Sequence, residues 1–115
     1  MPITSFSTTF PFCPQDEATV LVTAATGAQT ISLAPVPKSS NSLQRQVRVV
    51  NKSSTIEAQI RFGTSAAMGA ATLTTSIPIP ANDIEIFTLP ANVTHVSVIT
   101  GSSTAVLAFS IGAGV

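Results

Sequence analysis

The sequence has no tryptophan or tyrosine, one histidine and one cysteine. Sugar faces pack on tryptophan and tyrosine rings, so the absence of both weakens the case for a carbohydrate-stacking site. It also argues against a glycosidase, whose paired carboxylates usually work in an aromatic-lined cleft. The single cysteine, Cys13, cannot form a disulfide within the chain, so nothing in the sequence requires an oxidising compartment.

Charged residues make up only 9% of the chain, whereas about 25% is typical of globular proteins. The formal net charge is zero, which argues against a nucleic-acid binder that must neutralise several phosphates. The sequence contains neither an apolar run of about 18 residues nor a basic segment followed by an apolar one. We therefore expect neither a membrane span nor a secretory signal.

Most of the polar side chains are hydroxyls and not charged groups, since serine and threonine together number 30. The mean hydropathy of the chain is +0.46. A free monomer usually keeps charge for solubility, so this composition suits a protein whose faces are covered by neighbours. The alternative is simply a threonine-rich β protein.

Apolar and polar residues alternate in at least six short segments, separated by Pro, Gly, Asn and Ser. No segment repeats its apolar residues with the helical period of 3.6 over a length sufficient for a core helix. We therefore predict one all-β domain over residues 15–115, a single antiparallel β-sandwich or a small barrel of jelly-roll or Ig-like type, with seven to eight short strands. The predicted core comprises Val47, Val49, Ile60, Phe62, Ile86, Val96, Val98, Leu107 and Phe109, with Phe87 competing with Ile86 for the inside.

Two β-hairpins are predicted from the alternation. In the first, the runs within 47–63 turn at Ser53-Ser54, so that Val49 lies opposite Ala58 and Val47 opposite Ile60. The outward residues of this hairpin would be Gln46, Arg48, Glu57, Gln59 and Arg61. The second hairpin joins 18–24 to 29–34, with Gly27 supplying the permissive backbone of the turn.

Other segments are assigned from proline and from small residues. Pro78 would remove a ladder donor from a central strand, so 72–79 is predicted to be an edge strand, followed by a turn at 80–83. Residues 64–71 are small and fit either a loop or a single helical turn.

The first 14 residues carry three prolines and three of the six phenylalanines. Proline interrupts both helices and strand pairing, so we predict an extended arm anchored by Phe6, Phe10 and Phe12. The arm either folds back on its own domain or lies on a neighbouring subunit, and the sequence leaves both open.

Residues capable of catalysis are few. His95, the only imidazole, lies within a predicted strand without a cysteine or acid at a ligand-like spacing, so we expect a strand histidine making one hydrogen bond. Nothing in the sequence brings Cys13 to it, and no phosphate-binding glycine motif is present. We therefore predict no catalytic, cofactor-binding or metal-binding residue, and a protein that is not an enzyme.

All five basic residues lie between positions 38 and 61, while four of the five acids lie outside that window. In the predicted hairpin Arg48 and Arg61 share one outer face, which would be cationic. That face either keeps the sheet surface solvated or docks on an acidic patch through bidentate arginine–carboxylate contacts.

Two blocks of the sequence carry a resemblance to a known family. They comprise 46–55 with 60–65, and 77–82 with 84–89 and 93–96. Over positions 46–111 the chain resembles small β-sandwich virion structural proteins of tailed bacteriophages, and no functional residue of that family can be placed on it.

The resemblance implies a capsid cement or decoration protein, or a head or tail accessory. The implied partners are the major capsid protein or other virion subunits and further copies of the chain, without nucleic acid or membrane. It also implies a place in the virion, on the capsid surface, after synthesis in the host cytoplasm. The alternative is a receptor- or glycan-binding module of a tail or fibre. A pocket lined by polar groups would favour that module, and flat faces buried between chains would favour cement.

Overall fold

The computed structural model describes residues 13–33, 44–90 and 92–114. This part of the chain contains eight strands and no helix, as the alternation predicts. The strands are β2 (Cys13–Ala24), β3 (Gln29–Ser32), β4 (Gln44–Asn51), β5 (Ala58–Gly63), β6 (Ile77–Ile79), β7 (Ile84–Leu89), β8 (His95–Thr100) and β9 (Ala105–Gly114).

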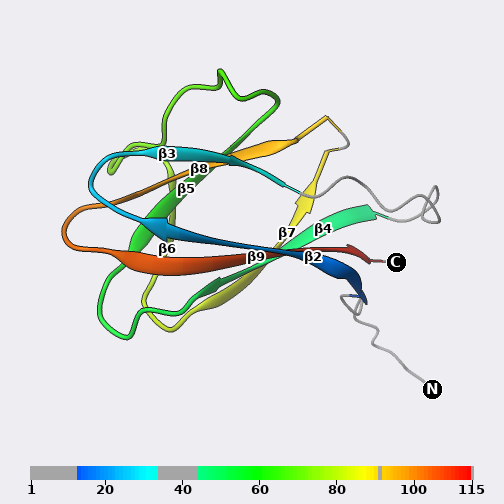
Figure 1. Cartoon of the computed structure of the whole chain (residues 1–115), viewed down its shortest axis with the longest axis horizontal. Coiled ribbons are helices and arrows are strands. Elements are labelled where there is room, and N and C mark those ends of the chain that lie inside the picture. Colours follow the sequence, from blue (N-terminus) through cyan, green and yellow to red (C-terminus); the bar gives the residue numbers. More distant parts are fainter. Residues whose placement is uncertain (1–12, 34–43, 91, 115) are drawn as a thin grey trace.

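The strands form two four-stranded sheets that pack face to face as a β-sandwich (Figure 1). One sheet has the order β2-β9-β4-β7 and the other β3-β8-β5-β6, and every neighbouring pair is antiparallel. We call them the first and the second sheet. The predicted all-β sandwich is confirmed.

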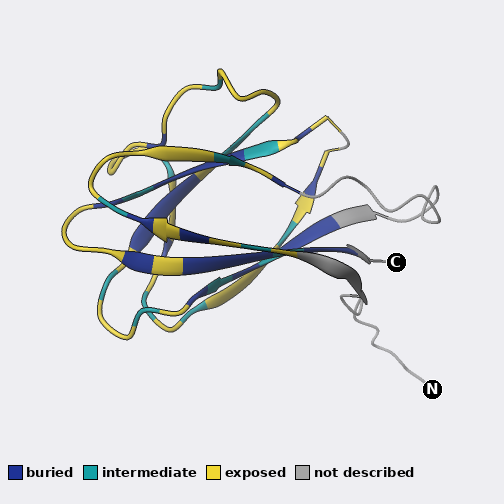
Figure 2. Ribbon diagram, viewed as in Figure 1, coloured by how far each residue is buried: buried dark blue, intermediate teal, exposed yellow. Residues whose placement is uncertain are grey.

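The core lies between the two sheets, where the inward residues of successive strands are fully buried (Figure 2). Phe62 is only partly buried, and its ring meets Phe87 of the opposite sheet edge-on at a centroid distance of 5.6 Å. Ile86 was wrongly placed inside, because Phe87 takes the inward position and Ile86 faces solvent. The other predicted core residues are all buried: Val47, Val49, Ile60, Val96, Val98, Leu107 and Phe109.

The predicted hairpin of residues 47–63 does not form, because β4 and β5 belong to different sheets. Val49 lies opposite Phe109 of β9, and Ile60 lies opposite Val98 of β8. Both strands do turn their predicted apolar residues inward. Alternation specifies which side of a strand is buried, but an arch between two sheets buries the same side as a hairpin within one.

The second predicted hairpin is wrong for the same reason, since β2 pairs with β9 and β3 pairs with β8. Residues 25–28 cross between the sheets, where the Thr100 amide donates to the Ala25 carbonyl at 2.8 Å. Gly27 does not adopt a positive φ, so the turn does not need its conformational freedom. The left-handed turn positions among the described residues are Asn82 and Ser103, with φ of 60° and 58°.

The edge-strand prediction is confirmed over a shorter range, because β6 covers only Ile77–Ile79 at the edge of the second sheet. Pro78 lies there opposite Gln59. Residues 80–83 turn as predicted, with the Asp83 amide donating to the Pro80 carbonyl at 3.2 Å. Residues 64–71 form a loop with one β-turn, closed by the Met68 amide donating to the Ser65 carbonyl at 3.1 Å.

The loop of residues 64–76 contacts the outer face of the second sheet. The Ala71 amide donates to the Ser97 hydroxyl at 2.9 Å, and Ser97 is fully buried on β8. Gln59, which alternation places on the solvent side of β5, is buried as well. The second sheet is therefore partly covered on its outside by its own chain.

Candidate functional site

The outer face of the first sheet carries a row of four apolar residues, one from each strand. Leu21 of β2 lies opposite Ala108 of β9, Ala108 opposite Val50 of β4, and Val50 opposite Ile84 of β7. On β2, β9 and β4 the neighbours Val22, Leu107, Phe109 and Val49 are buried between the sheets, so the row itself faces outward. The row crosses the whole width of the sheet.

The adjoining rows extend this surface. Val106 lies beside the row on β9, opposite Thr23, and Ile86 lies beside it on β7, opposite Arg48. We define the apolar face as Leu21, Val50, Ile84, Ile86, Val106 and Ala108. Its exposed fractions reach 60% for Leu21, 51% for Ile84, 50% for Ile86 and 37% for Val106.

Sandwich sheets normally turn polar residues to solvent, so an apolar outer face is a departure from the usual pattern. Within the described chain, only two other large hydrophobic side chains are exposed, Leu73 and Ile77. Contiguous exposed apolar surface marks a contact site for another molecule. The apolar face is thus the main candidate for function.

The sequence does carry a signal for this face. The segments around Leu21 and Val106 read as continuous apolar runs, Val20-Leu21-Val22 and Ala105–Phe109. Continuous runs are typical of strands buried on both sides. Attention to alternation alone missed this signal, and Ile86 was assigned to the core instead of to an outward face.

The predicted cationic face is not present. Arg48 lies on β4, half-buried between Ser110 and Ile86 on the outside of the first sheet. Arg61 lies on β5 opposite Ser97, on the outside of the second sheet. The two arginines therefore lie on opposite faces of the sandwich, because the strands that carry them do not pair.

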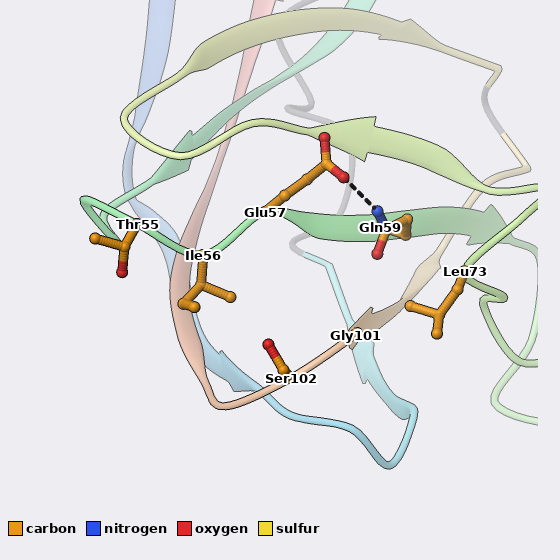
Figure 3. A pocket seen from close by; sticks show the side chains of 7 residues that line it. All are labelled: Thr55, Ile56, Glu57, Gln59, Leu73, Gly101 and Ser102. Carbon is orange, nitrogen blue, oxygen red and sulfur yellow. Dashed lines mark hydrogen bonds between the residues drawn. The ribbon is translucent and has the colours of Figure 1, made fainter.

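A cavity of about 310 Å³ lies at one end of the second sheet, where Figure 3 shows its side chains. The Gln59 amide nitrogen donates to the Glu57 carboxylate at 3.0 Å, and the Gln59 carbonyl oxygen is buried without a partner. The residues that line the cavity are Thr55, Ile56, Glu57, Gln59, Leu73, Gly101 and Ser102.

A second hollow of about 530 Å³ lies where β6 begins beside β5. Arg61 and Phe62 of β5 contribute to it, as do Thr75, Ser76 and Ile77 before and within β6. The side chains of Arg61 and Phe62 point to opposite sides of the sheet, Arg61 outward and Phe62 toward the core.

His95 is a half-buried strand residue whose Nδ1 lies 2.7 Å from the Thr94 hydroxyl, in agreement with the predicted single hydrogen bond. Within the described ranges, no three His, Cys, Asp or Glu residues lie together as a metal site would require. The same ranges contain no helix long and apolar enough to cross a membrane. Cys13 belongs to β2 and lies opposite Ala113, whereas Phe6, Phe10 and Phe12 lie outside the described residues.

Asp83 and Glu85 form an acidic pair at the start of β7. The Asp83 carboxylate raises the pKa of Glu85 above its ordinary value of 4.5, because it accepts a hydrogen bond from the protonated Glu85 carboxyl and repels the ionised form. Glu85 is solvent-exposed and Asp83 is half-buried, so the pair affects the local charge and not the packing of the core.

Comparison with known proteins found no matching protein-family model and no similar curated protein.

Proposed function

We propose that this chain is a non-enzymatic structural protein of a bacteriophage virion, a capsid cement or decoration protein that docks through the apolar face. The observation that carries the proposal is the outward row of Leu21, Ala108, Val50 and Ile84 across all four strands, in which Leu21 and Ile84 at the two edges are more than half exposed. An apolar sheet surface suits contact with an apolar surface of a partner.

The composition supports a role in an assembly. A surface with few charges and an exposed apolar sheet is poorly suited to a free monomer, whereas it is protected when neighbouring subunits cover it. The resemblance of residues 46–111 to virion proteins points to the kind of assembly. The proposed partners are the major capsid protein or other virion subunits and further copies of the chain, at the capsid surface, without nucleic acid or membrane.

The energy of such a contact is modest for one copy. Ile84 and Ile86 are about half exposed, so covering them fully would contribute on the order of 1 kcal/mol each. Repetition over many lattice positions, with each copy touching more than one subunit, would raise the overall stability of the particle.

The test is the occupancy of the chain on purified particles, measured as its ratio to the major capsid protein. The double variant Ile84→Thr and Ile86→Thr keeps β-branched residues in the strand while removing apolar surface. A loss of about 2 kcal/mol corresponds to roughly thirtyfold weaker docking. Leu73→Thr is the matched control, since Leu73 is 50% exposed but belongs to the loop over the second sheet. Unchanged occupancy in the double variant would refute docking by this face.

A receptor- or glycan-binding module of a tail or fibre is the second candidate, and the 310 Å³ cavity is the observation that favours it. Four of its lining residues are polar, Thr55, Glu57, Gln59 and Ser102, and Ile56 and Leu73 add apolar surface. Screening against soluble glycans, with Glu57→Ala as the variant, tests this role. Binding that is lost in Glu57→Ala, together with normal occupancy of the Ile84/Ile86 variant, would favour the module over cement.

A further inference from the structure

β7 forms one edge of the first sheet, and the backbone groups of three of its residues point away from the sheet. The Asn51 amide donates to the Asp83 carbonyl at 2.9 Å, so these two residues are a hydrogen-bonded pair of the β4–β7 ladder. Such pairs alternate along an antiparallel ladder, and the register here is continuous, so Glu85 and Phe87 also bond to β4. The residues between them, whose amide and carbonyl groups face the open edge, are Ile84, Ile86 and Thr88.

This edge is accessible to another chain. Ile84 and Ile86 are 51% and 50% exposed, and Thr88 is exposed as well. Within the described residues, β4 is the only strand that pairs with β7. Unpaired amide and carbonyl groups in a regular row are a template for a further strand.

The other three edges of the two described sheets carry features that oppose such pairing. β6 has three residues with Pro78 among them, and β3 has only four residues. β2 is longer, but its register shifts between Pro14 and Thr19, and the Gln29 side chain donates to the Thr23 carbonyl at 2.9 Å. Short strands, proline and bulges protect sheet edges from pairing. β7 has six residues in regular register without proline, so it is the edge most open to a further strand.

A second copy of β7 complements this edge when the two strands run antiparallel about a two-fold axis at Ile86. Ile86 then lies opposite Ile86 of the second copy, and Ile84 lies opposite Thr88. All three residues that face the edge become hydrogen-bonded pairs, which gives about six backbone hydrogen bonds. The strand therefore complements itself along its whole length.

The neighbouring registers are poorer. An axis at Glu85 would set two carboxylates directly opposite each other, which is destabilising. An axis at Phe87 would place Pro90, which has no amide hydrogen, opposite Ile84. The axis at Ile86 avoids both costs, so the sequence of β7 selects one register.

We propose that two copies of this chain pair edge to edge through β7, antiparallel and with the two-fold axis at Ile86. The two four-stranded sheets then become one continuous sheet, with the two apolar faces side by side on the same surface. The pairing uses backbone groups at the edge of the sheet, so it does not depend on docking to a capsid.

The predicted dimer is weak. Pairing along six residues covers far less surface than the roughly 1,200–2,000 Å² buried in a standard stable interface. The Glu85 carboxylate on the inner side of the edge also opposes close approach. We therefore expect a Kd on the order of 100 μM for the dimer.

The first measurement is sedimentation equilibrium of the full-length protein from about 20 μM to 1 mM, a range that brackets the expected Kd. Thr88→Pro and Thr88→Val are the matched variants, and neither alters the apolar face. Proline removes the amide that faces the open edge and leaves the bonds to β4 in place, whereas valine keeps that amide. Thr88→Pro should weaken the dimer at least about tenfold, and Thr88→Val should change it less than about threefold.

Amide hydrogen exchange, followed residue by residue in NMR spectra, identifies the edge that pairs. The amides of Ile84, Ile86 and Thr88 should exchange about threefold more slowly at about 1 mM than at about 50 μM, because a larger fraction of the chain is then paired. The amide of Leu21, on the edge strand of the opposite side of the sheet, is the control and should be unchanged.

Cysteine cross-linking tests the register, and it decides the proposal if Thr88→Pro fails to fold. Cys13, the single cysteine, is replaced by serine in each variant. Ile86→Cys should form a disulfide-linked dimer under mild oxidation, since Cα atoms in a hydrogen-bonded pair lie about 5.5 Å apart. Ile84→Cys should not, because the two copies of that residue would lie about 14 Å apart.

The outcomes separate the edge from other contacts. A monomer at all concentrations, equal association of the two Thr88 variants, or cross-linking of Ile84→Cys as readily as Ile86→Cys would each overturn the proposal. Protection of the β7 amides on particles but not in the free protein would overturn the second copy as the occupant and assign the edge to a strand of another virion protein. A dimer with the predicted cross-link, together with unchanged occupancy of the Ile84/Ile86 variant on particles, would support edge pairing while refuting capsid docking by the apolar face.

Discussion

The side chain of Asn51, at the end of β4 in the first sheet, donates a hydrogen bond at 3.0 Å to the carbonyl of Ile79, on β6 of the second sheet. The same amide nitrogen donates to the Ile56 carbonyl at 2.9 Å, and the Asn51 carbonyl oxygen accepts from the Ser53 amide at 2.9 Å. One buried side chain therefore ties the crossing segment to both sheets.

We expect Asn51→Ala to destabilise the fold by about 2–3 kcal/mol, because the buried carbonyl of Ile79 and the part-buried carbonyl of Ile56 would lose their donor. Asn51→Asp should be at least as harmful, since its carboxylate cannot donate. The free energy of unfolding, from urea titration, measures the effect. Asn92→Ala is the control, an exposed asparagine that should change stability by less than about 0.5 kcal/mol. Equal midpoints for Asn51→Ala and the control would contradict the role of this side chain.

Two neighbours on β9 distinguish core from contact surface. Leu107 is fully buried between the sheets, whereas Val106 belongs to the apolar face. Leu107→Ala should cost about 2–5 kcal/mol through a cavity, and Val106→Ala about 1 kcal/mol or less. Thermal unfolding measures both, and self-association followed by sedimentation should fall in Val106→Ala alone. Similar losses of stability in the two variants would show that Val106 is covered by its own chain.

The acidic pair on β7 predicts a pH effect. Because Asp83 raises the pKa of Glu85, the folded chain binds more protons than the unfolded chain just above pH 4.5. Stability should therefore fall as the pH rises through the raised pKa, and recover as the pH falls back. Glu85→Gln should remove this slope from urea midpoints measured between about pH 4 and 7. The effect should be small because Glu85 is exposed, and a slope unchanged in the variant would assign it to other groups.

The anchoring role predicted for Phe6, Phe10 and Phe12 remains a prediction, since these residues lie outside the described part of the chain. Deletion of residues 1–12 should leave the sandwich folded, because β2 begins at Cys13. Attachment to particles or oligomerisation should weaken, since each buried Phe would contribute on the order of 2 kcal/mol. Replacing Phe6, Phe10 and Phe12 with serine tests the side chains without shortening the chain. Full attachment by both variants would exclude the arm as an interface.

Much of the fold follows from local alternation. Val47, Val49 and Ile60 had to face inward whichever strands lay beside them, because exposing them would forfeit their burial energy. Pro78 restricted its segment to an edge because it lacks an amide hydrogen. The sequence alone thus determined the strands, most of the core, and the all-β class.

Strand pairing could not be derived in this way. A hairpin and an arch bury the same residues of β4 and β5, and the difference lies in contacts far apart in sequence, such as Val49 with Phe109 and Asn51 with Ile79. The positions of the apolar face and of the two arginines depend on which strands pair. Pairing in separate sheets placed Arg48 and Arg61 on opposite sides and aligned Leu21, Ala108, Val50 and Ile84 in one row. Only the tertiary structure decided these surfaces, because they are made by neighbours across strands and not by neighbours along the chain.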